Sequence, residues 1–317
     1  MSDRVRITEV GPRDGLQNEP GVIPTVEKVR LVELCAATGV DEVEVTSFVS
    51  PKWVPQLGDA AEVFRAVRGL DHTTHKTMFS ALVPNERGME AAELVARTPT
   101  LLEKVAVFTA ASETFARKNI NATIAESLAR FKPIVERAKH TGSVPVLVRG
   151  YVSCAIACPF EGPIAPSAVL DVASRLIDIG VDEVDLGDTI GAGTPTTVRA
   201  LLEAVHSGLG RHWWTSDTMT LHLHDTFGRA ADCVKVALDL GVRSFDGSVA
   251  GLGGCPYAST PGNRAPGNIS TEALVRTVHA AGYETGVNLD RLAAAADYAR
   301  EIVARSRAGS GPGLPPV

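Results

Sequence analysis

The sequence lacks the features that would mark a membrane, secreted or nucleic-acid-binding protein. No apolar run reaches membrane-spanning length, and residues 1–8 have neither the apolar core of a signal peptide nor the Arg and Ser content of a transit peptide. There is no basic tract, and the formal net charge is -6. We therefore expect no membrane and no nucleic acid as partners.

Cysteine is also scarce, with five residues in a chain of 317. An odd number in a chain of this length argues against a disulfide framework, so we expect a reducing, cytoplasmic location. Cys35 and Cys233 lie in helix-like patterns and are expected in the core. Cys154 and Cys158 do not have the spacing of a thioredoxin or zinc-ribbon motif, and we interpret them as small buried side chains.

A repeated βα unit runs along the whole chain. Short β-branched runs alternate with helix-like segments. The candidate strands cover residues 5–10, 42–46, 76–83, 104–108, 146–152, 183–186, 219–224 and 244–249. The candidate helices cover residues 25–38, 60–67, 86–96, 123–140, 167–179, 196–209, 229–240, 270–281 and 289–306. Gly39, Gly180 and Gly241 each end a helix just before the chain re-enters the sheet.

Eight such units predict an α/β fold, specifically a (β/α)8 TIM barrel with an extra C-terminal helix. An open doubly wound sheet would need a Gly-rich phosphate turn after the first strand, and none is found. We expect one catalytic domain over residues 1–306, and a disordered tail over residues 307–317, where Gly and Pro dominate. In this fold active sites lie at the C-terminal ends of the strands.

The most informative stretch is His222-Leu223-His224, at the end of the seventh candidate strand. Alternate residues of a strand point to the same face, so the two imidazoles can meet one ion. Two packed, hydrogen-bonded histidines are the plainer alternative. A strand supplies only a pair of ligands, so the residues at the neighbouring strand ends must decide between the two readings.

Ionisable residues gather at the ends of several other strands. Arg13 and Asp14 follow the first strand, Glu44 lies in the second, Asp188 follows the sixth, and Cys255 lies in a Gly-rich loop after the eighth. Taken singly, Asp14 and Asp188 could simply cap helices. Because all of these residues fall on one face of the predicted barrel, together they favour a catalytic metal site.

Two of these residues have a further chemical argument. A carboxylate inside a β-branched strand points into the barrel unless it faces the helices, and burial there requires a cationic partner. For Glu44 the obvious partner is Arg13. The thiol of Cys255 lies in a loop where it has room to meet a ligand, so we expect it to be catalytic.

Six sequence strings give the chain a specific resemblance. They are VGPRDGLQNE (10–19), TSFVSPKWVPQ (46–56), KNIN (118–121), GYVSC (150–154), LGDTIG (186–191) and SVAGLGGCPY (248–257). Over residues 7–292 the chain resembles the hydroxymethylglutaryl-CoA lyases. Arg-Asp-Gly, Gly-Asp-Thr and His-x-His-Asp are shared by the whole DRE-TIM metallolyase group, which includes isopropylmalate and homocitrate synthases. Gly-Leu-Gln-Asn and Cys-Pro-Tyr mark the lyase branch.

The resemblance implies a divalent cation, Mg²⁺ or Mn²⁺, as cofactor. Its ligands would be Asp14, His222, His224 and an asparagine after the Cys255 loop. Oxygen and imidazole ligands with open positions suit such a cation. The loop is longer than in the family, so the asparagine is either Asn268 or Asn263, and we favour Asn268 because the residues after it match the helix entry of the family.

The implied reaction is a retro-Claisen cleavage of 3-hydroxy-3-methylglutaryl-CoA to acetyl-CoA and acetoacetate. Arg13 would face the developing enolate oxygen, Glu44 would orient Arg13, and Asp14 or a metal-bound water would assist removal of the hydroxyl proton. Cys255 would act in proton transfer. The catalytic set expected is Arg13, Asp14, Glu44, Asp188, His222 and Cys255. The residues expected to contact substrate are Gln17, Ser47, Arg149, Tyr151 and Thr189.

Departures from the family pattern leave the acyl group open. Pro20 stands where a lysine is expected, and Arg229 stands where glutamine is usual. The alternatives are a lyase for citramalyl-CoA or a longer branched 3-hydroxyacyl-CoA, a Claisen-type acyltransferase, and a barrel that binds CoA esters without turnover. The expected partner is a small-molecule acyl-CoA substrate, and a homodimer is an open alternative for the assembly.

Overall fold

A closed barrel of parallel strands forms the centre of the protein. The computed structural model describes residues 4–67, 77–96, 102–140, 145–254, 259 and 265–309. Within this part of the chain eight strands follow the order β1-β10-β9-β8-β5-β4-β3-β2, and β1 closes the ring by pairing with β2. The barrel strands are β1 (Arg6–Glu9), β2 (Glu42–Ser47), β3 (Met78–Leu82), β4 (Lys104–Ala110), β5 (Leu147–Ser153), β8 (Glu183–Asp188), β9 (Met219–Leu223) and β10 (Ser244–Gly247).

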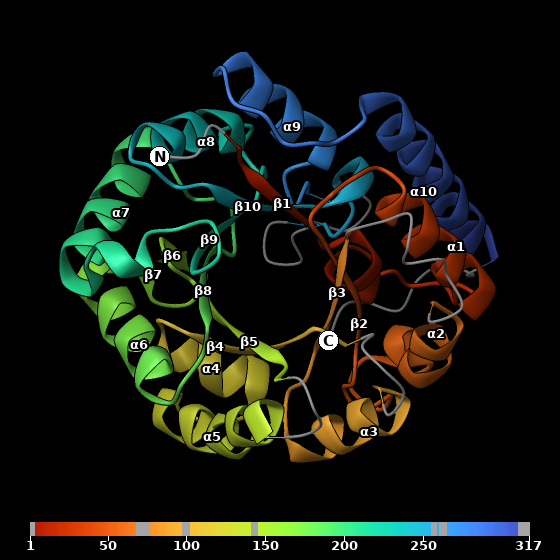
Figure 1. Cartoon of the computed structure of the whole chain (residues 1–317), viewed down its shortest axis with the longest axis horizontal. Helices are drawn as coiled ribbons and strands as arrows, with labels where there is room; N and C mark the ends of the chain where they lie inside the picture. The colour runs from red at the N-terminus through yellow and green to blue at the C-terminus, as the bar shows by residue number, and fades with distance from the viewer. Residues whose placement is uncertain are drawn as a thin grey trace.

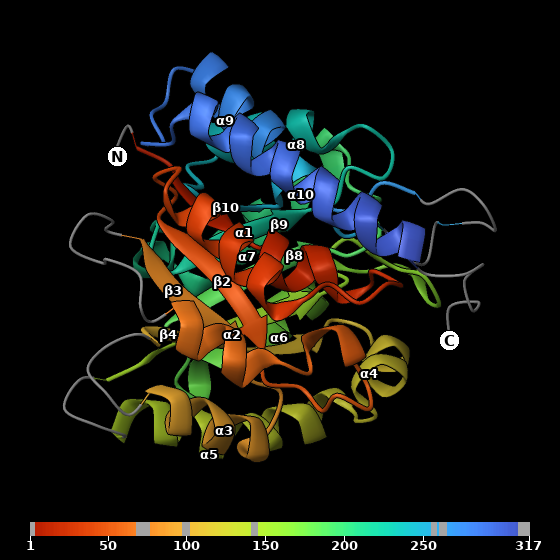
Figure 2. The ribbon, with the colours of Figure 1, turned by 90° about the vertical axis from the view of Figure 1, so that its right-hand side faces the viewer.

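Helices surround the barrel as an outer ring (Figure 1). Figure 2 shows the same ring from the side, with α3 and α5 along one edge and α9 and α10 along the opposite edge. The helices are α1 (Thr25–Ala36), α2 (Ala60–Val67), α3 (Glu86–Ala96), α4 (Glu113–Ile120), α5 (Ile124–His140), α6 (Pro166–Asp178), α7 (Pro195–Leu209), α8 (Ala230–Asp239), α9 (Thr271–Ala280) and α10 (Leu289–Gly309). The predicted fold class is therefore confirmed.

The three predicted helix-ending glycines have the backbone conformation that this role requires. Gly39, Gly180 and Gly241 have φ values of 90°, 98° and 92°, in the left-handed region that side chains disfavour. Each is followed by a buried valine that leads toward the next strand. The repeated Gly-Val pair thus ends a helix and returns the chain to the sheet.

Three local features differ from the expectation. Helix α4 lies between β4 and α5, where no helix was predicted; Ser112 caps it by accepting a hydrogen bond from Phe115 N. A small antiparallel pair, β6 (Ala157–Cys158) and β7 (Gly162–Pro163), follows β5. Helix α10 continues to Gly309 rather than ending at residue 306, because Arg307 pairs with the buried Glu19 at 2.9 Å. The remaining predicted tail, 310–317, lies outside the described residues.

Burial matches the interpretation of four cysteines. Cys35, Cys154, Cys158 and Cys233 are buried and are not disulfide-bonded. Among the described residues, no helix combines the length and the apolar character that a membrane crossing needs.

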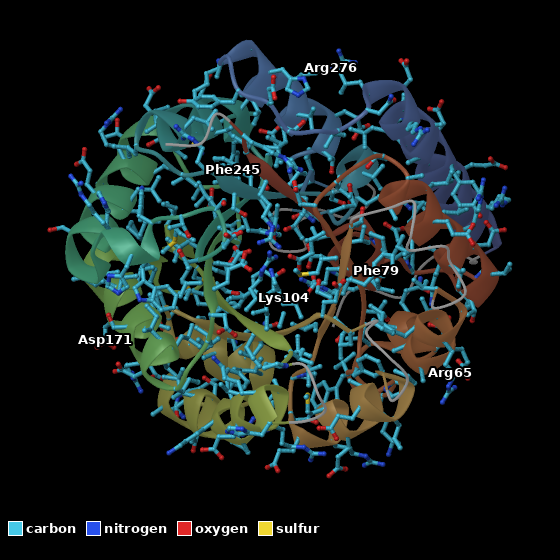
Figure 3. The ribbon with its side chains drawn as sticks, in the orientation of Figure 1. Arg65, Phe79, Lys104, Asp171, Phe245 and Arg276 are labelled. Carbon is cyan, nitrogen blue, oxygen red and sulfur yellow. The ribbon has the colours of Figure 1, made fainter. Side chains whose placement is uncertain are left out.

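Charged side chains fill the interior of the barrel, where branched apolar residues are usual. Lys104 Nζ lies 2.6 Å from Glu42 and 2.5 Å from Glu183. Arg149 lies 2.8 Å from Glu183. All four residues are at most 1% exposed. Figure 3 shows Lys104 at the centre of the ring, whereas Arg65, Asp171 and Arg276 lie at its outer rim. Each buried charge has a partner of opposite sign, which offsets the cost of removing it from water.

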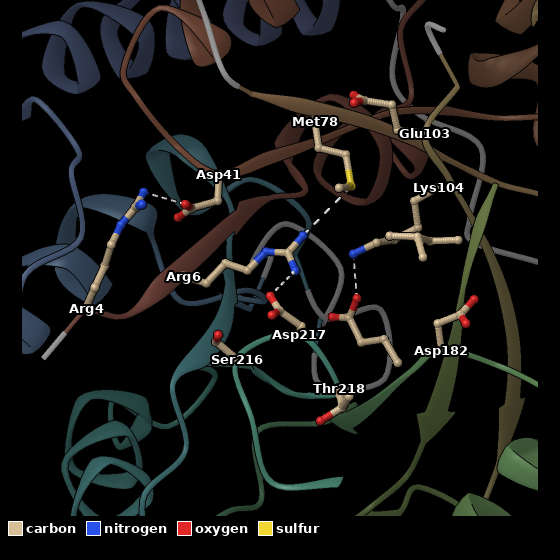
Figure 4. A pocket seen from close by; sticks show the side chains of 12 residues that line it. Arg4, Arg6, Asp41, Met78, Glu103, Lys104, Asp182, Ser216, Asp217 and Thr218 are labelled. Carbon is tan, nitrogen blue, oxygen red and sulfur yellow. Dashed lines mark hydrogen bonds and ion pairs between the residues drawn. The ribbon is translucent and has the colours of Figure 1, made fainter. Parts of the chain in front are cut away.

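A hollow of about 540 Å³ opens at the N-terminal mouth of the barrel, below this charged layer. Figure 4 shows Arg6 directed between Met78 and Asp217, with Lys104 beside it. The hollow lies at the end of the barrel opposite the C-terminal strand ends, so it does not belong to the candidate site described below.

The buried cation of Lys104 gives a stability prediction. We expect Lys104→Met to lower the free energy of unfolding by about 3–5 kcal/mol, because it removes one of the two buried cations that Glu42 and Glu183 share, the other being Arg149. The control is Lys139→Met, which removes a partly exposed ion pair with Asp182 and should cost less than about 1 kcal/mol. Urea unfolding measures both, and equal losses would contradict the argument.

Candidate metal centre and active site

A single turn of π-helix, η1 (Gly11–Gly15), carries the first two site residues. It follows β1 directly, and the backbone N–H groups of Asp14 and Gly15 both donate to the carbonyl of Val10, at 2.8 and 3.2 Å. Single π-turns are rare and often occur at functional sites. The turn places Arg13 and Asp14 over the C-terminal end of the barrel, as the sequence predicted.

Arg13 is held between two carboxylates. Its Nε donates to Glu44 Oε2 at 2.5 Å, and its Nη1 donates to Asp14 Oδ1 at 2.7 Å. Burial alone would lower the pKa of the guanidinium, but the two carboxylates raise it, so Arg13 stays charged. Glu44 is 1% exposed. Arg13 is thus the cationic partner that the burial of Glu44 was expected to require.

The carboxylate of Asp14 and the imidazoles of His222 and His224 meet at one point. One potential ligand atom from each lies within 4.8 Å of the other two. The rings of the two histidines are 5.4 Å apart between centroids, because both residues point inward from the end of β9. Asp14 comes from the η1 turn, so the cluster joins segments more than 200 residues apart in the chain.

The protonation states of Asp14 and His224 suit a cation. Burial opposes the charge of Asp14, but Arg13 and the histidines lower its pKa to about 2, so it is a carboxylate at neutral pH. Burial, together with the neighbouring His222, lowers the pKa of His224 to about 3 and keeps that imidazole neutral. Deprotonated carboxylate and neutral imidazole are the forms that bind metal ions.

Asn268 completes the cluster from the segment before α9. Its Nδ2 donates to Asp14 Oδ2 at 2.7 Å and to the carbonyl of Leu252 at 3.1 Å. These two bonds fix the orientation of the amide and direct its Oδ1 away from both acceptors. Among the described residues, Asn268 Oδ1 and His224 Nδ1 are buried without a hydrogen-bond partner. Two unsatisfied acceptors beside a carboxylate fit a bound cation. The alternative ligand, Asn263, lies outside the described residues.

Two glycines allow the backbone to approach Asn268 closely. A Cβ on Gly253, whose φ is 91°, would lie 2.7 Å from Asn268 Nδ2. A Cβ on Gly267 would lie 1.5 Å from the carbonyl oxygen of Gly253. Side chains at these positions would therefore displace the asparagine, which explains the need for glycine at both.

Asp246 is a site residue that the sequence analysis missed. Its Oδ2 lies 3.1 Å from His222 Nδ1, and its side chain is almost fully buried in β10. The sequence pattern that identified Glu44, a carboxylate inside an apolar strand, could also have identified Asp246.

Two of the expected substrate contacts lie deeper in the barrel than expected. Arg149 is 1% exposed, and its guanidinium lies near the carboxylates of Glu42, Glu183, Asp185 and Asp246. Tyr151 accepts a hydrogen bond from Arg149 at 3.2 Å, and its ring lies beneath the guanidinium of Arg13. Their contact with substrate stays a prediction.

The other predicted residues lie around the rim. Asp188, at the end of β8, accepts from the backbone N–H groups of residues 192 and 193, and burial raises its pKa to about 6. Thr189 Oγ1 accepts from the backbone of Cys154. Ser47 is buried at the end of β2, and Gln17 is partly exposed after η1. Cys255 lies outside the described residues.

Comparison with known proteins places this geometry in a family. The model of the HMGL-like family matches residues 4–298. The chain is 46% identical over 301 residues to the mitochondrial hydroxymethylglutaryl-CoA lyase of Arabidopsis thaliana; the match covers 95% of this chain and 60% of that protein. It is 45% identical over 294 residues to the cytoplasmic 3-hydroxy-3-methylglutaryl-CoA lyase of Danio rerio, covering 93% of this chain and 82% of the relative.

A solved structure resembles the whole chain. It is an HMG-CoA lyase from Acinetobacter baumannii in complex with coenzyme A and 3-methylmalate, with a TM-score of 0.84 and 32% sequence identity, covering 100% of this chain and 99% of that one. The family match spans the barrel and every described residue of the Asp14, His222, His224 and Asn268 cluster. The chain therefore belongs to the HMGL-like family.

Proposed function

We propose that the chain is a divalent-metal-dependent acyl-CoA lyase. It would cleave 3-hydroxy-3-methylglutaryl-CoA to acetyl-CoA and acetoacetate by a retro-Claisen reaction. The observation that carries this proposal is the cluster of Asp14, His222, His224 and Asn268 directly beside the buried cation of Arg13. The lyase names of two relatives and the coenzyme A complex of a structural neighbour support the substrate class.

The ligand set suits Mg²⁺ or Mn²⁺. One carboxylate, one amide oxygen and two imidazoles provide a mixed oxygen and nitrogen environment that leaves positions for substrate oxygens. When bound, the cation would supply Lewis acidity that lowers the pKa of the substrate hydroxyl.

Arg13 is the residue placed to stabilise the enolate that forms during cleavage. Nε and Nη1 of its guanidinium are engaged with Glu44 and Asp14, whereas Nη2 has no hydrogen-bond partner among the described residues. A fixed, buried guanidinium with a free donor interacts most strongly with charge that develops in the transition state. Glu44 orients this donor because it holds Nε from inside the barrel.

Asp14 serves better as a ligand than as a proton acceptor. Its pKa of about 2 makes the carboxylate a weak base. Its two oxygens also accept hydrogen bonds from Arg13 and Asn268, and these contacts set its orientation. We therefore assign Asp14 the role of fixing the cation next to Arg13.

We propose a cytoplasmic location, supported by the unpaired thiols of the four described cysteines. The relatives carry both mitochondrial and cytoplasmic names. We propose that a small-molecule acyl-CoA is the partner of the site, which the coenzyme A complex of the structural neighbour supports.

The reaction is tested with a panel of CoA esters. With Mg²⁺ or Mn²⁺ present, we expect release of acetyl-CoA from 3-hydroxy-3-methylglutaryl-CoA, and we expect EDTA to abolish it because the cation is required. Citramalyl-CoA and a longer branched 3-hydroxyacyl-CoA are assayed in parallel.

The outcomes of this panel separate the alternatives. Faster cleavage of another ester would change the acyl group and keep the reaction class. Condensation of acetyl-CoA with a 2-oxoacid in place of cleavage would favour an acyltransferase. If no ester is cleaved and CoA esters still bind, the protein is a binding barrel and the lyase proposal fails.

Arg13 gives a kinetic prediction. Arg13→Lys keeps a cation beside Glu44 but loses the planar fork that bonds two carboxylates and substrate together. We expect kcat to fall by roughly a hundredfold, with a smaller change in KM. The control is Arg276→Met, on the exposed face of α9, which should leave both constants within about twofold of the wild type. A large rise in KM at unchanged kcat would assign Arg13 to ground-state binding instead.

A further inference from the structure

We propose that Asp246 is a positioning residue that selects the tautomer of His222. By accepting a hydrogen bond from Nδ1–H, it leaves the unprotonated Nε2 of His222 directed at the cation. This inference rests on the metal site of the proposed function. It adds to that site Asp246, which hydrogen-bonds the side of His222 that faces away from the cation.

The sheet places the two side chains together. Asp246 on β10 and His222 on β9 are register partners in a parallel pair, so both point into the barrel at the same level. The distance from His222 Nδ1 to Asp246 Oδ2 is 3.1 Å, and the carboxylate is 1% exposed. Water is therefore excluded as a competing partner for this side of the ring.

Asp246 is itself held from below. Arg149 Nη1 lies 3.2 Å from Asp246 Oδ1, and the Tyr151 hydroxyl lies 3.5 Å from Oδ2. Arg149 is anchored in turn by Glu183 at 2.8 Å. The guanidinium of Arg149 faces Asp246 as its buried ion-pair partner, and an ionised carboxylate can only accept hydrogen bonds. It therefore requires a proton on the facing nitrogen.

The tautomer matters because a neutral imidazole has one donor nitrogen and one acceptor nitrogen. If Nε2 of His222 carried the proton, a hydrogen would point at the cation and the lone pair would be turned away. His224 differs, because its Nδ1 has no hydrogen-bond partner among the described residues. Of the two candidate ligand histidines, His222 is thus the one whose Nδ1 is engaged by a carboxylate.

The first measurement reads the tautomer in the wild-type protein. Protein labelled with ¹⁵N-histidine and freed of metal is examined by long-range ¹H–¹⁵N NMR, which distinguishes the two neutral tautomers and the protonated ring. The His222 signals are assigned by their loss in His222→Gln. We expect a protonated Nδ1 and a bare Nε2 in the neutral ring. A neutral His222 protonated at Nε2 would overturn the inference.

The second measurement uses Asp246→Asn, whose amide can either accept from or donate to Nδ1. We expect His222 to become a mixture of tautomers and Mn²⁺ to bind about 10–100-fold more weakly, measured by electron paramagnetic resonance of free Mn²⁺. The control is Asp182→Asn, which makes the same change at the N-terminal end of the barrel, where the carboxylate pairs with Lys139 and accepts a hydrogen bond from Val148 N. It should change Mn²⁺ affinity by less than about threefold.

The outcomes separate this inference from the proposed function. Mn²⁺ binding by Asp246→Asn as tight as in the wild type, or equal weakening by both variants, overturns the positioning role while the lyase assay still stands. Absence of Mn²⁺ binding by the wild type overturns the metal site and the inference together. Circular dichroism of both variants confirms that a loss of affinity is not a loss of fold.

Discussion

The structure depends on the pairing of charges inside a closed barrel. Lys104, Glu42 and Glu183 form a layer near the N-terminal mouth, and Arg149 joins this layer to Asp246. A charge buried without a partner would be costly, so these side chains can hold only a few mutual arrangements. The barrel interior is for this reason a rigid polar support for the candidate metal cluster at the C-terminal end, which it contacts through Asp246 and His222.

Much of the fold could be predicted because its signals are local. A β-branched run, a helix-like segment and a Gly-Val pair repeat along the chain, and each can be recognised without its neighbours in space. Helix α4 was missed because it is short and polar and its main signal is a serine cap. The end of α10 was misplaced because Arg307 is stabilised by Glu19, nearly 290 residues earlier.

The contacts of the candidate site also divide into those that could be predicted from local sequence and those that could not. The histidine pair and the partnership of Arg13 with Glu44 could be inferred, because strand alternation and the cost of a buried carboxylate act within a few residues. Asp246 could not be linked to His222, since the register between β9 and β10 is set only when the barrel closes. Arg149 shows the same limit: its position in a strand was evident, but its depth and its carboxylate neighbours were not.

Gly253 and Gly267 are the two ends of a segment that leaves the site and returns to it. The two glycines bring the chain back to nearly the same point beside Asn268, with the carbonyl of Gly253 against Gly267. Insertions and deletions between residues 253 and 267 can alter the length of that segment without moving the ends that fix the asparagine. The length of this segment is thereby uncoupled from the position of the Asn268 amide.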